Sequence, residues 1–245
     1  MIYPTDFINK IVNIDCLIGM KDIPDNSVDM IFTSPPYNTG GKGKCKGFYQ
    51  DYDDNLTDGE YYNLLSGCLK EGLRICNGGI FININYTTNN KRPLYRFISD
   101  FSEFLKENII WKKENVQPPI GNILGKRYEY ILLFTKNKDF EINDFRNNKG
   151  EKYKHIFGNW VSNLIELKKD GTKFSDIHKA GFSIDLPSLF IEIYTKENDI
   201  VLDPFIGLGT TAVAAKHLDR RFIGMEISED YCEVSRQRLG QKVLI

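Results

Sequence analysis

Two short segments of the sequence bring together residue types that could do chemistry. The first follows the strand-like run Asp29–Phe32 and reads Thr33-Ser34-Pro35-Pro36-Tyr37. Consecutive prolines hold the backbone extended and prevent it from turning into a helix. The segment is therefore expected to form a rigid ledge that presents the Ser34 hydroxyl, the Pro35 carbonyl and the face of the Tyr37 ring.

These three groups suit the activation of an exocyclic base amine. The amine of adenine or cytosine is a poor nucleophile because its lone pair is delocalised into the ring. Two acceptors that bind its hydrogens would draw the nitrogen toward tetrahedral geometry and free the lone pair. The base must first leave the duplex, which costs a few kcal/mol, and stacking on an aromatic ring returns roughly 1–3 kcal/mol. We predict that the catalytic residues are Ser34, Pro35, Pro36 and Tyr37, with a surface Pro-Pro turn as the structural alternative.

The second segment follows Asp199–Leu202 and reads Asp203-Pro204-Phe205-Ile206-Gly207-Leu208-Gly209-Thr210-Thr211. Its two glycines allow a ligand to approach the backbone closely. A helix is predicted to begin here, and its N-terminus, capped by Thr210 or Thr211, favours an anion such as a carboxylate. About twenty residues further on, Glu226 ends a predicted strand and is placed to accept hydrogen bonds from ribose hydroxyls. The pattern therefore favours a binding loop for a nucleoside-like cofactor over a glycine-rich turn that binds nothing.

Short apolar runs alternate with amphipathic stretches and predict the elements that must position both segments. Seven strands are predicted: Ile11–Asp15, Val28–Thr33, Gly79–Asn85, Ile109–Lys112, Tyr130–Thr135, Asp199–Asp203 and Phe222–Glu226. The predicted helices are Cys16–Asp22, Asp58–Ile75, Pro93–Glu107, Pro187–Thr195, Thr210–Leu218 and Glu229–Leu239. This pattern favours a mostly parallel sheet with helices on both faces. Ligands of such sheets bind at the carboxyl ends of the strands, where both segments lie.

With these elements in place, the sequence resembles the DNA amino-methyltransferases of bacterial restriction–modification systems. It is similar to their beta group in particular, in which the catalytic motif precedes the cofactor motif. Thr33–Tyr37 matches the catalytic motif and Asp203–Thr211 the cofactor motif, and the resemblance covers nearly the whole chain. It implies S-adenosyl-L-methionine as the cofactor and double-stranded DNA as the substrate.

The resemblance also implies cofactor contacts outside the two segments. Asp15 resembles the acid that ends the family's opening strand and reaches the cofactor adenine. His178 and Phe182 are similar to a segment that contacts the methionine end, although Lys179 and Ser183 replace the two prolines of the usual form His-Pro-x-x-Phe-Pro. The complete predicted cofactor-binding set is Asp15, His178, Phe182, Asp203, Pro204, Phe205, Gly207, Gly209, Thr210, Thr211 and Glu226.

The order of the motifs predicts a circularly permuted Rossmann-like methyltransferase fold. In the usual order the strand before the glycine loop comes first, the strand before Pro-Pro-Tyr comes fourth, and the two are neighbours. Here residues 199–226 would supply the first two strands, Ile11–Asp15 the third and Val28–Thr33 the fourth. We expect residues 1–135 to form the catalytic half, 136–177 a small inserted target-recognition region, and 178–245 the cofactor-binding half.

Two polar segments interrupt the alternation of strands and helices. Residues 38–57 are rich in Gly and Lys and are predicted to form a long mobile loop. Residues 136–177 are rich in Asn and Lys and show little periodicity; Trp160 resembles a recurring Trp at the end of the family's target-recognition region. Unstructured loops of this length inside compact domains are usually functional or belong to an inserted lobe.

The residue at position 34 bears on the target base. In this family Ser-Pro-Pro-Tyr is associated more with cytosine N4, and Asp- or Asn-Pro-Pro-Tyr with adenine N6, so Ser34 favours cytosine N4 over adenine N6. Other classes stay open: an amide methyltransferase, an RNA substrate, and a non-catalytic nucleic-acid-binding module that retains the fold. Acceptors at Ser34, Asp203 and Glu226 argue against such a decayed module.

Composition limits the partners and the location. The net charge is −1, so a positive surface for DNA must be local, and the candidates are Lys42–Lys46 and Lys136–Lys179. The sequence shows no long apolar run and no signal-type segment, which predicts a cytoplasmic protein without a membrane partner. Five cysteines without a CxxC pair and three dispersed histidines predict reduced thiols and no metal site. The resemblance adds a homodimer and a cognate restriction endonuclease as expected partners.

Overall fold

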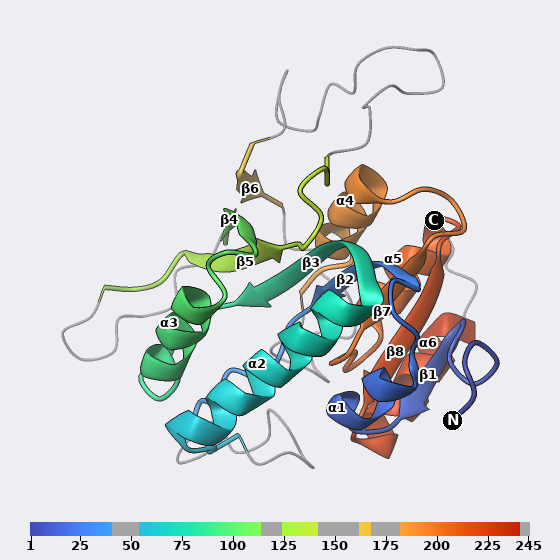
Figure 1. The fold of residues 1–245 in the computed structure, drawn as a ribbon, viewed down its shortest axis with the longest axis horizontal. Helices are drawn as coiled ribbons and strands as arrows, with labels where there is room; N and C mark the ends of the chain where they lie inside the picture. The colour runs from blue at the N-terminus through green and yellow to red at the C-terminus, as the bar shows by residue number, and fades with distance from the viewer. Residues whose placement is uncertain (41–53, 114–123, 142–161, 168–181, 241–245) are drawn as a thin grey trace.

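The strands of the described residues form one eight-stranded sheet (Figure 1). The computed structural model describes residues 1–40, 54–113, 124–141, 162–167 and 182–240. Across the sheet the strands lie in the order β1-β8-β7-β2-β3-β5-β4-β6. Their bounds are β1 Lys10–Asn13, β2 Val28–Thr33, β3 Cys76–Ile84, β4 Leu105–Lys112, β5 Tyr128–Phe134, β6 Leu164–Glu166, β7 Ile200–Asp203 and β8 Arg221–Glu226.

The directions of the strands confirm a mostly parallel sheet. β5 pairs antiparallel with both of its neighbours, β3 and β4, and every other pair in the described sheet is parallel. β2 lies beside β7, with Met30 opposite Val201 and Ile31 opposite Leu202. β7 is followed outward by β8 and β1, as the permuted order predicted. The circularly permuted arrangement is therefore confirmed.

Helices cover both faces of this sheet. Their bounds are α1 Cys16–Gly19, the 3₁₀ helix η1 Met20–Asp22, α2 Asp58–Ile75, α3 Lys91–Asp100, α4 Asp185–Tyr194, α5 Thr210–His217 and α6 Glu229–Gly240. α2 has the predicted bounds, and Thr57 and Glu60 form a reciprocal capping box at its start. Within the described part of the chain, no helix is long and apolar enough to cross a membrane.

The sheet separates two apolar clusters. On the face covered by α1, α2 and α3, which Figure 1 shows toward the viewer, the fully buried rings of Tyr61 and Phe97 pack on β2, β3 and β5. On the other face, Phe190 of α4 and Ala214 of α5 pack on the opposite side chains of the same strands. Alternate residues of each central strand enter opposite clusters: Ile31 belongs to the first and Phe32 to the second.

Several details differ from the predictions, and three of them have a clear physical reason. β6 is an eighth strand inside the segment 136–177, where none was expected; its three residues are too few for periodicity to reveal, and only Ile165 at its centre is buried. α3 ends at Asp100 instead of Glu107, because Leu105 already begins β4. Residues 76–78, which separate the predicted helix Asp58–Ile75 from the predicted strand Gly79–Asn85, belong to β3, because α2 runs directly into β3 at Cys76.

Gly78 and Gly79, near the start of β3, have a packing role. A Cβ at Gly78 would lie 2.1 Å from the carbonyl oxygen of Asp29, and one at Gly79 would lie 2.6 Å from the ring of Phe140. Both positions therefore require glycine because neighbouring atoms approach the backbone closely.

Candidate active site

The Pro-Pro-Tyr ledge follows β2 at its carboxyl end and is fixed by hydrogen bonds to its backbone. Pro36 is buried, and its carbonyl oxygen accepts a hydrogen bond of 2.8 Å from the Tyr61 hydroxyl of α2. The Tyr37 carbonyl oxygen accepts one of 2.7 Å from the Asn90 side chain, which is fully buried. Ser34 and the Tyr37 ring are half-buried. The backbone of the ledge is thus held from within the protein while both side chains keep some exposure.

Asn38 closes the ledge. It has a φ of +51°, a left-handed conformation that Asn tolerates better than most residues. Its side-chain amide donates to the Leu56 carbonyl at 2.9 Å and accepts from the Leu56 amide at 2.8 Å. The segment beyond, residues 41–53, lies outside the described residues, so most of the loop predicted over 38–57 stays a prediction.

The glycine loop follows β7, the strand next to β2. Gly207 and Gly209 have φ angles of +52° and +82°, which strongly favour glycine. A Cβ at Gly207 would meet no atom within 4 Å, whereas one at Gly209 would lie 3.0 Å from the Ser235 side chain. Gly207 therefore has open space beside its Cα, and Gly209 allows α6 to approach the loop.

The predicted side-chain cap of α5 is wrong. Gly209 is the N-cap residue, and no described side chain caps this helix end. The Thr211 hydroxyl donates instead to Asp203, while the Thr210 hydroxyl accepts from Arg238 at 3.2 Å. Both threonines are used to hold the loop, which leaves the first amides of α5 without a side-chain cap.

Asp203 joins the two segments. Its carboxylate accepts hydrogen bonds from the Thr33 hydroxyl at 2.6 Å, from the Thr211 hydroxyl at 2.7 Å and from the Phe205 amide at 3.0 Å. The side chain is buried at 2% exposure, and burial raises its pKa from 3.8 to about 6 against the opposing effect of these donors. Asp203 therefore ties β2 to the glycine loop.

Glu226, at the end of β8, supports the glycine loop from the neighbouring strand. One of its carboxylate oxygens accepts from the Gly207 amide and the other from the Ser228 amide, each at 3.0 Å. Glu226 remains half-buried. The next residue, Ile227, is 42% exposed, so an apolar side chain follows the acid at the surface.

The remaining predicted cofactor residues have various surroundings. Asp15 is exposed and caps α1, accepting from the Leu17 amide at 2.8 Å. Pro204 is buried and Phe205 half-buried in the glycine loop. The Phe182 ring packs edge-on against Phe32 of β2, with centroids 5.6 Å apart. His178 lies outside the described residues, as does Trp160.

Several residues that support the ledge were not predicted. Tyr61 and Asn90 hold the carbonyl groups of Pro36 and Tyr37, and Glu129 accepts from the Tyr37 hydroxyl. Glu129 carried a signal in the sequence, because it is a charged residue directly before the apolar run Tyr130–Phe134. A carboxylate at the start of a buried strand requires partners, and one of them is the Tyr37 hydroxyl.

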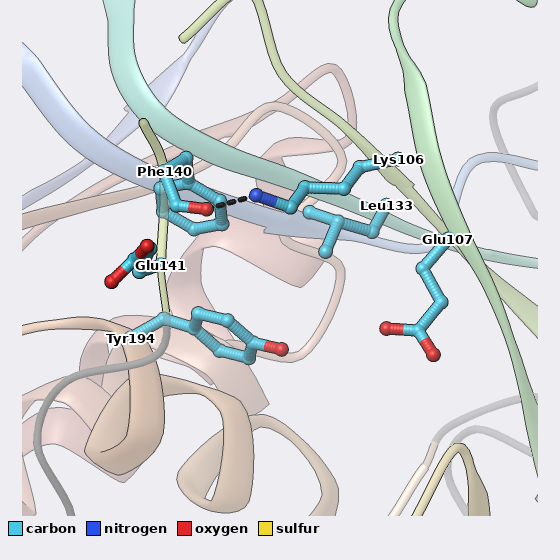
Figure 2. Close-up of a pocket in the computed structure, with 6 residues that line it drawn as sticks. All are labelled: Lys106, Glu107, Leu133, Phe140, Glu141 and Tyr194. Atoms are coloured by element: carbon cyan, nitrogen blue, oxygen red, sulfur yellow. Dashed lines mark hydrogen bonds between the residues drawn. The ribbon is translucent and has the colours of Figure 1, made fainter. Parts of the chain in front are cut away.

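A separate pocket of about 370 Å³ lies at the other end of the sheet (Figure 2). It is lined by residues from the start of β4, the end of β5 and the end of α4, among them Lys106, Leu133 and Tyr194. The Lys106 amine donates to the Phe140 carbonyl, and the Phe140 ring stacks on Tyr194 with centroids 5.4 Å apart. Burial raises the pKa of Tyr194 to about 12. This pocket is remote from the ledge and the glycine loop, which lie at the carboxyl ends of the parallel strands.

The described residues include no group of three or more His, Cys, Asp or Glu side chains that could hold a metal ion. The four described cysteines, at positions 16, 68, 76 and 232, are free and buried.

The permuted α/β sheet, with a Ser-Pro-Pro-Tyr ledge beside a glycine loop, defines the class of the amino-methyltransferases. Residues 28–237 match the family model described as DNA methylase. The chain belongs to this family of N6- and N4-directed DNA methylases.

Named relatives agree with this assignment. The type II methyltransferase M.BglII of Bacillus subtilis is 31% identical over 97% of this chain and 71% of its own length. The type II methyltransferase M.HinfI of Haemophilus influenzae is 30% identical over 96% of this chain and 69% of its own length.

Two solved structures share the fold. The PvuII DNA methyltransferase, described as cytosine-N4-specific, superposes with a TM-score of 0.72 at 20% identity and covers 96% of this chain and 87% of its own. The complex of M1.HpyAVI with S-adenosylmethionine gives a TM-score of 0.61 at 27% identity over 94% of this chain and 98% of its own.

Proposed function

We propose that this DNA methylase transfers a methyl group from S-adenosyl-L-methionine to the exocyclic N4 amine of cytosine in duplex DNA, acting on a base flipped out of the helix. The observation that carries the proposal is the hydrogen bond of 2.6 Å from Thr33 to Asp203. This bond joins the strand that precedes the Ser34 ledge to the loop that we assign to the cofactor. A methyl donor and an amine acceptor must meet, and this arrangement brings their two sites to one edge of the sheet.

The cofactor of this family is S-adenosylmethionine, and related solved structures contain it. The structure offers a loop that fits such a molecule: Gly207 has open space beside its Cα, and the N-terminus of α5 lacks a side-chain cap. We assign the ribose hydroxyls to Glu226, the carboxylate to the start of α5, and further contacts to Asp15, Phe182 and His178. When bound, the cofactor supplies the electrophilic methyl group.

The residues of the ledge prepare the amine. The Ser34 hydroxyl and the Pro35 carbonyl oxygen each accept a hydrogen bond from the amine. These two hydrogen bonds draw the nitrogen toward tetrahedral geometry and free its lone pair. Pro35 and Pro36 hold the acceptors in place because their φ angles are fixed. The Tyr37 ring stacks on the flipped base and offsets part of the cost of extrusion. No cysteine nucleophile is needed, because the reaction occurs at an exocyclic nitrogen and not at a ring carbon.

The residue at position 34 supports cytosine over adenine. Ser34 supplies a hydroxyl where Asp or Asn is associated with adenine N6 in this family. Adenine N6 is the competing target, because a hydroxyl and a carboxylate both accept from an amine.

Segment 136–177 is proposed as the target-recognition region. Its described part includes β6, which pairs with β4 and extends the sheet there. The division into residues 1–135, 136–177 and 178–245, the homodimer, the partner endonuclease and the cytoplasmic location stay predictions from the sequence and the resemblance.

Nucleoside analysis tests the proposed function. The chain is expressed in a host without DNA methyltransferases, and its DNA is digested and separated by liquid chromatography with mass spectrometry. We expect N4-methylcytosine in the wild-type sample and none with Ser34→Ala. N6-methyladenine without N4-methylcytosine would reject cytosine as the target. Absence of both from wild-type samples, with DNA binding retained, would favour the non-catalytic module.

A further inference from the structure

The Tyr37 ring is held at its hydroxyl end by a buried carboxylate of β5. The Tyr37 hydroxyl donates a hydrogen bond of 3.0 Å to Glu129 Oε2. Glu129 is only 7% exposed, and its other oxygen, Oε1, accepts from the Lys113 amine. A carboxylate in such surroundings is stable only with partners of this kind, so the contact holds the three side chains together.

Glu129 and Lys113 belong to a scaffold that is independent of the ledge. β4 and β5 pair antiparallel, with Trp111 opposite Glu129. Just beyond β4, the Lys113 amide donates to the Arg127 carbonyl at 2.7 Å, and the Lys113 amine lies 4.8 Å from the centre of the Trp111 ring. The carboxylate that receives the Tyr37 hydroxyl is therefore fixed by strand pairing and not by the loop that it supports.

The backbone of Tyr37 is fixed from a third element. Its carbonyl oxygen accepts from the Asn90 side chain, and that same side chain donates to the Asn85 carbonyl at 3.1 Å. With the carbonyl and the hydroxyl both anchored, the position and the long axis of the ring are set before a base arrives. A ring that is already oriented loses less conformational freedom when a ligand stacks on it.

We propose that Glu129, supported by Lys113, is a positioning residue that orients the Tyr37 ring for the flipped base. This inference rests on the proposed function, since it assigns the stacking surface to Tyr37. Glu129 acts through the Tyr37 hydroxyl and does not itself contact the base. Removal of the carboxylate should therefore matter only while that hydroxyl is present.

A double-mutant cycle tests this dependence. The variants are Glu129→Ala, Tyr37→Phe and their combination, with kcat and KM measured by transfer of labelled methyl groups from S-adenosylmethionine to unmethylated bacterial genomic DNA. We expect Glu129→Ala to lower kcat about tenfold in the wild-type background and by less than about twofold in the Tyr37→Phe background. Glu129→Gln keeps an acceptor for the phenol and should stay within about threefold of wild type.

Two further measurements distinguish a positioning role of Glu129 from general loss of structure. They are the cofactor affinity of Glu129→Ala and the kcat of a matched control variant. Calorimetry should give a cofactor Kd for Glu129→Ala within about twofold of wild type, because the glycine loop is untouched. The matched control is Asp100→Asn, since Asp100 accepts from the Tyr62 hydroxyl at 2.7 Å and Arg96 lies 4.2 Å from the Tyr62 ring centre, away from the site. We expect wild-type kcat for this control.

Each contrary result has a distinct meaning. Equal losses from Glu129→Ala in both backgrounds, or a parallel loss of cofactor affinity, would overturn the positioning role. Should Glu129→Ala fail to fold, Tyr37→Phe decides alone, because a wild-type kcat would show that the hydroxyl is not needed. A wild-type protein without any transfer to DNA would instead reject the proposed function.

Discussion

The Thr33 hydroxyl donates a hydrogen bond of 2.6 Å to Asp203, a residue 170 positions away in the sequence. Thr33 ends the strand that leads into the Ser-Pro-Pro-Tyr ledge, and Asp203 begins the glycine loop. Because both side chains are buried, the bond is shielded from water and sets the spacing of the two loops. The hydrogen bond therefore holds the Ser-Pro-Pro-Tyr ledge and the glycine loop in a fixed position relative to each other.

Thr33→Val should remove the hydrogen bond between the two segments while leaving the packing around position 33 unchanged. The valine keeps the volume of threonine but leaves the buried Asp203 carboxylate without one of its donors. We expect a loss of about 1–3 kcal/mol in the free energy of unfolding, measured by urea denaturation, together with lower transfer activity. Thr135→Val is the control, since its hydroxyl donates to the neutral Gly78 carbonyl at 3.1 Å. An equal loss in both variants would contradict a special role for the Thr33 contact.

Asp203 should make stability depend on pH. Burial raises its pKa in the folded protein from 3.8 to about 6, so the folded state holds the proton more tightly than the unfolded state does. Its contribution to stability is therefore full below about pH 4 and is lost as pH rises through 6. The comparison to make is urea denaturation of wild type and Asp203→Asn across this range.

Relative to wild type, the Asp203→Asn variant should gain stability as pH rises from 4 to 7, and the difference should level off above that. The exposed Asp100→Asn serves as the control and should show no such trend. A constant difference between wild type and Asp203→Asn at all pH values would contradict the assigned pKa shift.

The two glycines of the cofactor loop should respond differently to alanine. Gly207→Ala places a methyl group in open space, so it should cost about 1–2 kcal/mol through its positive φ alone while reducing cofactor affinity. Gly209→Ala adds the contact with Ser235 at 3.0 Å and should be the less stable of the two. Thermal unfolding and calorimetric titration with S-adenosylmethionine measure the two effects. Unchanged cofactor affinity in Gly207→Ala would place the cofactor elsewhere.

Ser34→Ala and Tyr37→Ala should strongly reduce transfer while leaving cofactor binding intact. Loss of an acceptor that acts on the amine in the transition state is expected to lower kcat about a hundredfold, as for other preorganised hydrogen-bonding groups. Calorimetry should give cofactor affinities close to wild type. If affinity collapsed in both variants, the base pocket would not lie at this ledge.

Much of the fold could be predicted from the sequence because its central strands are strongly apolar. Val28–Thr33 is predicted and observed with the same bounds, and so is α2 at Asp58–Ile75. The permuted order followed from the positions of two motifs and the usual strand order of the methyltransferases that the sequence resembles. β6 could not be predicted, because three residues with one buried side chain give no periodic signal, and its stability comes from pairing with β4.

The sequence indicated the segments of the candidate site but not the hydrogen bonds that join them. Motif spacing pointed to Ser34, Gly207 and Glu226, but no pattern along the chain indicates which hydroxyl meets Asp203. The cap assigned to Thr210 or Thr211 failed for this reason, since tertiary contacts use both hydroxyls. Contacts such as that of Tyr37 with Glu129 join residues 92 positions apart and emerge only from the fold.

The permuted strand order has a consequence for the protein while it is being synthesised. β2 emerges from the ribosome early, but its neighbour β7 and the Asp203 carboxylate follow about 170 residues later. Until then β2 has no partner strand on that side. The hydrogen bond from Thr33 to Asp203, which sets the spacing of the two loops, cannot yet form. A nascent chain therefore carries the residues that we assign to the base long before the loop that we assign to the cofactor can lie beside them. We therefore expect methyl transfer only from chains whose final strands have docked.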